Sequence, residues 1–175
     1  MVPVFSLAAG AGAELGLHSV GPSLSTLWAA WLKLRGPFGL RAFAAIPGSS
    51  EHGRVTEGSV EVRPTLLGIG LALAPQHNDA WLLPHASWGG VAAAIETRGT
   101  ADDPRASHGG STWLVGGYAQ LGAGLRLARD VRLNLDVTGI VLPTPAVILV
   151  NRREVARWGA PAGIVSLGIE VFTND

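Results

Sequence analysis

Residues 113–127 read WLVGGYAQLGAGLRL, and they indicate the fold more clearly than any other stretch of the chain. Every second residue, counted from the tryptophan, is apolar or glycine. The residues between them include Tyr118, Gln120, Arg126 and several glycines. Successive side chains of a β-strand point to opposite faces. This alternation therefore predicts a strand with one apolar face and one face that is polar or small.

The same alternation recurs on both sides of this stretch. It is clear in residues 5–18, 24–35, 38–46, 131–138 and 165–172, and weaker in 59–75 and 81–98. Together these segments predict eight strands and an all-β fold. We expect a single domain that spans residues 1–175, because 175 residues suit one domain better than two.

The predicted connections alternate between short and long. Tight turns are expected at 35–37, 75–79 and 128–130. The other connections are a shorter one around 19–23 and longer ones at 48–58, 99–111 and 142–161. Short turns at one end and long loops at the other are typical of an eight-stranded antiparallel up-and-down transmembrane barrel. An even number of strands places both chain ends on the periplasmic side, with the tight turns.

The composition excludes several other classes of protein. Apolar residues make up 47% of the chain and charged residues only 15%, yet no stretch reaches the roughly 20 apolar residues that a spanning helix needs. The formal net charge is zero, which gives no attraction to nucleic acid. No cysteine is present, so disulfides and thiolate metal sites are excluded. No Lys or Arg precedes Glu14, and we expect that an export signal has been removed from this chain.

The charges indicate which face of the barrel meets lipid. They fall opposite the aliphatic face, where a lipid-exposed Arg or Lys near the midplane would cost about 2–4 kcal/mol. Inside a narrow lumen, such charges must be paired and hydrogen-bonded. The predicted lumen network comprises Glu14, Lys33, Arg41, Tyr118, Gln120, Arg126, Arg132, Asp136 and Glu170.

Three local features allow more than one interpretation. Glu61 and Arg63 share the parity of the aliphatic residues after them, so either they lie beyond the membrane or a bulge near Pro64 resets the register. Residues 81–98 are small and apolar on both faces, so the sequence does not show which of these residues face the lipid and which face the lumen. The segment Leu24–Leu34 also has near-helical spacing of its large residues, although we expect a strand there because its neighbours alternate.

The whole chain resembles the small eight-stranded outer-membrane barrels of the OmpA and OmpX kind. The resemblance is strongest in residues 116–127 and in the closing strand 165–172. It implies a Gram-negative outer-membrane location, contact with outer-membrane lipid, and insertion by the barrel assembly machinery, which recognises a terminal aromatic residue. Here Phe172 is followed by three more residues, so that signal is displaced.

Two other functions are alternatives to a structural barrel. His85, Ser87 and Glu96 resemble the catalytic residues of lipid A-modifying barrel enzymes, which use Ser as nucleophile and His as base. The flanking residues of that family are missing here, because Trp88 and Gly89 follow the Ser, and we predict no catalytic residue. A soluble lipid-binding barrel would instead turn the aliphatic face inward. The five histidines have no ligand spacing, so we predict neither a metal nor a cofactor.

The expected function therefore rests on the lumen and the loops. Eight strands leave an interior just wide enough for side chains to fill, so a polar, filled lumen and no open pore are expected. Loops 99–111 and 142–161 are the candidate sites for a surface partner. Residues 146–150 are apolar and precede a charged segment, which predicts a hairpin above the membrane; its edge either binds a partner by strand addition or only lengthens the barrel.

Overall fold

The structure is a computed structural model that describes residues 3–16, 23–49, 51–55, 58–74, 80–101, 109–144, 146–150, 153–158 and 161–174. Eight strands form the barrel wall, and three shorter ones lie at its loop end. The wall strands are β1 (Pro3–Gly16), β2 (Ser23–Lys33), β3 (Phe38–Pro47), β5 (Gly58–Leu73), β6 (Leu82–Ala101), β7 (Gly109–Ala128), β8 (Val131–Val141) and β11 (Ala162–Asn174). The shorter strands are β4 (Glu51–Val55), β9 (Ala146–Val150) and β10 (Arg153–Trp158).

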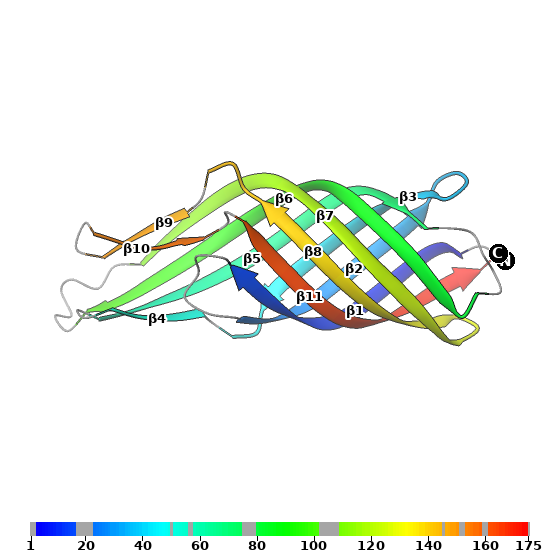
Figure 1. Cartoon of the computed structure of the whole chain (residues 1–175), viewed down its shortest axis with the longest axis horizontal. Coiled ribbons are helices and arrows are strands. Elements are labelled where there is room, and N and C mark those ends of the chain that lie inside the picture. Colours follow the sequence, from blue (N-terminus) through cyan, green and yellow to red (C-terminus); the bar gives the residue numbers. More distant parts are fainter. Residues whose placement is uncertain are drawn as a thin grey trace.

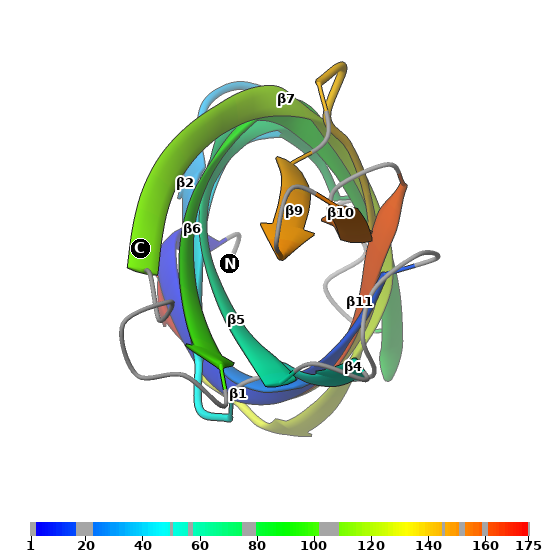
Figure 2. The ribbon, with the colours of Figure 1, turned by 90° about the vertical axis from the view of Figure 1, so that its left-hand side faces the viewer.

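The wall closes into a barrel in which every pairing is antiparallel. The strand order is β3-β2-β1-β11-β8-β7-β6-β5, and the β3–β5 pairing joins the two ends. Figure 2 shows the resulting ring seen from the loop end. Strand β4 extends the sheet along β5, and β9 and β10 form a separate hairpin. In Figure 1 these shorter strands lie at one end of the barrel, while both termini lie at the other.

Tight turns connect the strands at the end that carries the termini. Strands β2 and β3 meet through Leu34–Pro37, where the Leu34 amide donates to the Phe38 carbonyl over 3.0 Å. Gly36 has φ = +59° in this turn, a conformation that favours glycine because it has no Cβ. This hairpin and the two-residue β7–β8 turn confirm two of the three short connections that the sequence predicts; the third, at 75–79, lies outside the described residues.

Aliphatic side chains cover the outside of the barrel. Along β11, Val165, Leu167, Ile169 and Val171 are exposed, and Ser166 between them is buried. The same alternation holds around the wall, so the outer surface is an apolar belt. A soluble barrel would instead turn such residues inward. The fold is therefore a transmembrane barrel, as the alternation predicts. Among the residues that the structure describes, no helix is long and apolar enough to cross a membrane.

The register of β5 answers one question that the sequence leaves open. Pairing with β6 runs without interruption from Gly58 opposite Ala101 to Leu73 opposite Ala86, so the bulge expected as one alternative near Pro64 is absent. Glu61 and Arg63 therefore point outward on the same face as Leu67. They lie toward the loop end of the strand, where their side chains form an ion pair of 2.6 Å.

Two further expectations, for residues 24–34 and for the loop 99–111, can be compared with the structure. Residues 23–33 form strand β2, so the helical alternative for this segment is wrong. The tryptophans of β2 lie on opposite faces, with Trp28 57% exposed on the outside. The expected loop 99–111 is shorter than predicted, because β6 continues to Ala101 and β7 begins at Gly109. Residues 102–108 lie outside the described part of the chain.

Candidate functional site in the barrel lumen

A buried carboxylate holds two basic side chains at the middle of the lumen. Asp136 on β8 accepts from Arg41 on β3 through Oδ2 (3.2 Å to Nη2), and its Oδ1 lies 2.6 Å from Nε2 of His85 on β6. All three side chains are less than 15% exposed. Because β3 and β8 lie on opposite sides of the barrel, the Arg41–Asp136 ion pair connects these two sides, while His85 reaches Asp136 across β7 alone.

Gly122 makes room for the His85–Asp136 contact. It lies between these residues in register, opposite His85 on β6 and opposite Asp136 on β8. A Cβ at this position would lie 2.0 Å from Asp136 Oδ1 and 2.5 Å from His85 Nε2. The glycine-rich luminal face of β7 therefore leaves space into which side chains of the neighbouring strands extend.

An aromatic pair and an amide lie beside this cluster. Tyr118 packs edge-on against Phe43, with ring centroids 4.9 Å apart. Ser87 donates to Oε1 of Gln120 over 2.9 Å. A cavity of about 30 Å³ borders Arg41, Asp136 and other luminal residues. This is room for about two water molecules.

A second polar group lies closer to the tight turns. Glu170 on β11 accepts from Ser6 through Oε1 and from Asn134 Nδ2 through Oε2, the latter over 2.9 Å. Arg132 lies with its guanidinium 4.3 Å from the centroid of the Phe172 ring. Phe172 is buried, so the terminal aromatic faces the lumen.

Much of the loop-side lumen is filled by apolar side chains, beside the buried Glu14, Ser23 and Thr138, so the interior is less polar than expected. Val62, Leu66, Ile95, Ile140 and Ile164 are at most 1% exposed and belong to one cluster of buried side chains. We call this group, with Val91, Ala93 and Leu142, the luminal plug. The sequence did not reveal it, because β5 and β6 carry apolar or small residues on both faces and their phase is set only by pairing with neighbouring strands.

The nine residues predicted for the lumen network occupy different levels rather than one network. Arg41 and Asp136 meet in the central cluster, Tyr118 and Gln120 lie beside it, and Arg132 and Glu170 lie near the turns. The other three lie at other levels of the barrel. Glu14 is buried near the loop end, opposite Ile164, and Lys33 is half-buried at the turn-side mouth. Arg126 is exposed and donates to the carbonyls of Ala128 and Arg129.

His85 was not predicted as a partner of the central carboxylate. A lone histidine gives no signal of such a role, and only the register of β6, β7 and β8 reveals it.

Structural comparison identifies the class of barrel. No family model and no curated protein sequence matches this chain. Solved structures do match: the outer-membrane protein OprG of Pseudomonas aeruginosa has a TM-score of 0.68 at 13% identity, covering 97% of this chain and 96% of that one. The chain has the fold of the small eight-stranded outer-membrane barrels.

Two further barrels give similar values. Ail of Yersinia pestis has a TM-score of 0.65 at 8% identity, covering 98% of this chain and 99% of that one. The Neisserial surface protein NspA has a TM-score of 0.65 at 11% identity, covering 97% of each chain. At these identities the likeness concerns the fold alone.

The geometry of His85, Ser87 and Glu96 differs from a catalytic triad. Ser87 is 1% exposed inside the lumen and donates to Gln120, while His85 contacts Asp136. Glu96 is exposed and has the opposite parity, so it lies on the outer face. A nucleophile needs its base within hydrogen-bond reach and access to substrate. In this arrangement, Ser87 has neither.

Proposed function

We propose that this protein is a non-conducting outer-membrane barrel that acts at the cell surface through its loop end. In this proposal the barrel assembly machinery inserts the protein, and outer-membrane lipid surrounds its apolar belt. The luminal plug and the central ion cluster support a closed lumen, which argues against a transport role. The surface role is supported by the length of the strands.

The observation that carries the proposal is the projection of β6 and β7 beyond the barrel. Each has 20 residues, whereas a tilted strand crosses a bilayer with about 9–11. About half of each strand is therefore available above the membrane. Strand β7 pairs with β8 only from Gly117 onward, so one edge of residues 109–116 pairs with no other strand in the described part of the chain. Figure 1 shows these strands continuing past the end of β8, toward the β9–β10 hairpin.

The partner in this proposal binds the β9–β10 hairpin, which lies within the loop that we expected at 142–161. Residues 151–158, NRREVARW, contain three arginines and one glutamate, so the hairpin is basic in sequence. A polyanion is the matching chemistry. Ail was solved in complex with the heparin analogue sucrose octasulfate. Heparin is therefore a suitable first probe for this chain.

Replacing residues 146–158 with a Gly-Ser linker is expected to weaken binding to immobilised heparin at least about tenfold, since several charges are removed together. The protein is folded into detergent micelles, and its faster migration without heating verifies the barrel. A matched control replaces residues 102–108, which contain two aspartates and one arginine, and retains binding. Equal binding by the hairpin variant and the intact protein would contradict the proposed role of the hairpin.

A further inference from the structure

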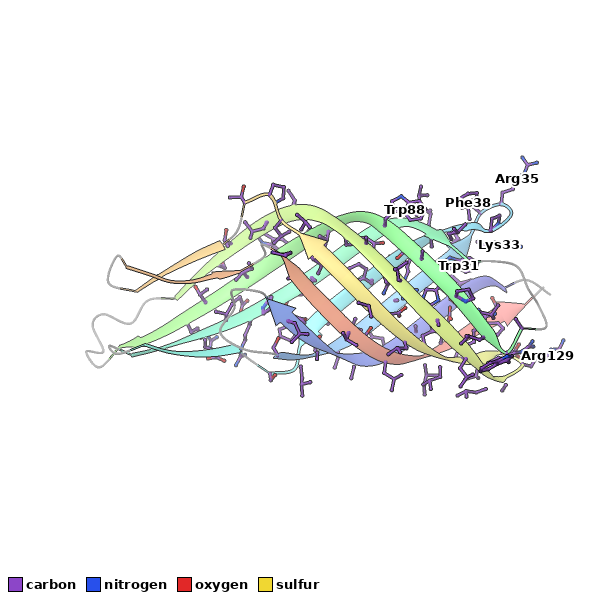
Figure 3. All side chains as sticks on the ribbon, in the orientation of Figure 1. Trp31, Lys33, Arg35, Phe38, Trp88 and Arg129 are labelled. Carbon is purple, nitrogen blue, oxygen red and sulfur yellow. The ribbon has the colours of Figure 1, made fainter. Side chains whose placement is uncertain are left out.

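The β2–β3 hairpin carries two cations that no described carboxylate neutralises. Lys33 ends β2 at the turn-side mouth of the lumen, and Arg35 lies exposed in the turn. Neither forms an ion pair with a described residue. Figure 3 shows Arg35 extending away from the barrel beyond the turn. An exposed guanidinium just beyond the apolar belt lies at the level of the lipid headgroups when the barrel is in a membrane.

The β7–β8 hairpin at the same end of the barrel differs in its charge and hydrogen bonding. Its turn contains Asp130 beside Arg129, so a carboxylate accompanies the cation. The guanidinium of Arg126 already donates to two carbonyls of its own turn, each over 3.4 Å. Figure 3 shows Arg129 on the opposite side of the rim from Arg35. The two hairpins thus form a natural comparison within one molecule.

An apolar surface lies on the outer wall next to Arg35. Leu34 and Phe38 flank the turn and are 53% and 48% exposed. Leu40 continues the same face of β3 and lies in register with Leu71, which in turn lies opposite Trp88. Figure 3 shows Phe38 on the outside of the barrel near Arg35, and Trp88 on the same side but farther from the turn. An acyl chain can lie along this surface while its headgroup reaches the turn.

We propose that the β2–β3 hairpin binds an anionic phospholipid through its phosphate-containing headgroup. Arg35 makes the main contact with the phosphate, because a guanidinium can donate two parallel hydrogen bonds to phosphate oxygens. Lys33, on the luminal face of β2 at the mouth of the lumen, adds to the positive charge near the turn, and Leu34 and Phe38 on the outer face hold the acyl chain. Basic residues close to a membrane surface attract anionic lipids by about 1 kcal/mol each, which corresponds to about fivefold in binding.

Native mass spectrometry tests this proposal on the intact barrel, released from micelles that contain equal amounts of phosphatidylglycerol and phosphatidylcholine. The protein is expected to retain phosphatidylglycerol preferentially. Arg35→Gln lowers the ratio of retained phosphatidylglycerol to phosphatidylcholine about fivefold, and Lys33→Gln/Arg35→Gln lowers it further. The control Arg126→Gln/Arg129→Gln changes it less than about twofold. Heat-modifiable gel migration verifies that every variant is folded.

Two results would overturn the proposal. Equal retention of both lipids by the unmodified protein would show that the hairpin does not select anionic headgroups. Equal losses in the two double variants would assign the effect to the overall charge of the rim rather than to this hairpin. Excess inorganic phosphate is expected to leave the lipid bound, because it lacks an acyl chain. If phosphate alone displaced the lipid, the acyl chain would add nothing to binding, and the apolar surface of Leu34 and Phe38 would not belong to the site.

Discussion

Asp136→Ala is expected to lower the free energy of unfolding by about 3–5 kcal/mol, the usual cost of removing one partner from a buried ion pair. The carboxylate of Asp136 contacts both Arg41 and His85 inside the lumen. Without it, the Arg41 guanidinium stays buried and has lost its only ion-pair partner among the described residues. Urea titration in detergent micelles, followed by tryptophan fluorescence, measures the change.

An exposed ion pair in the same protein supplies the control. Glu61 and Arg63 form a closer contact, 2.6 Å, but the arginine side chain is 48% exposed. Glu61→Ala is therefore expected to cost less than about 1 kcal/mol.

A double replacement keeps the test informative if Asp136→Ala fails to fold. Arg41→Met/Asp136→Leu removes both charges and is expected to recover much of the lost stability, because an apolar pair needs no neutralisation. A cost for Asp136→Ala no larger than that for Glu61→Ala would contradict the role assigned to the central cluster.

Gly89→Ala is expected to lower the free energy of unfolding by about 1–3 kcal/mol, as overpacking does in a well-packed interior. A Cβ on Gly89 would lie 2.2 Å from the Ile69 carbonyl oxygen and 2.4 Å from the Gly70 Cα. Gly70 is the register partner of Gly89, so two glycines allow β5 and β6 to approach on the luminal side. Backbone atoms cannot rotate away as a side chain can, and the strands must separate.

The adjacent residue is a matched control for this replacement. Gly90 points outward, and the nearest atom to a Cβ there is the Gly116 carbonyl oxygen at 3.9 Å. Gly90→Ala is expected to stay within about 0.5 kcal/mol of the unmodified protein. The same urea titration compares the two variants. Equal effects at the two positions would show that the inward and outward faces of β6 are assigned incorrectly.

The fold was predictable because its main determinant is local. The alternation along residues 113–127 can be recognised without knowing the neighbouring strands. In the structure this segment is β7, which pairs with β6 and β8, its neighbours in the sequence. The outward direction of the aliphatic residues was also predictable, because the charged residues lie on the opposite face. Charges cannot lie against lipid without a large cost, so their parity marks the luminal face.

The interior was less predictable because it depends on contacts between strands distant in sequence. Arg41 and Asp136 are 95 residues apart, and no local pattern joins them. His85 reaches Asp136 only because the glycine at position 122 lies between them in register. The luminal plug was missed because the pattern of β6 is apolar or small on both sides. The contacts inside the lumen therefore follow from how the strands pair, which the alternation along a single strand does not show.

Single-channel recording across a planar lipid bilayer tests the closed, side-chain-filled lumen most directly. The folded protein is expected to give no current steps, because the luminal plug and the central cluster fill the interior. As a positive control, Ile95→Ala/Ile140→Ala trims two buried plug residues and is expected to produce measurable steps from the same amount of folded barrel. Regular current steps from the unmodified protein would contradict the account, since they require a continuous aqueous path through the lumen.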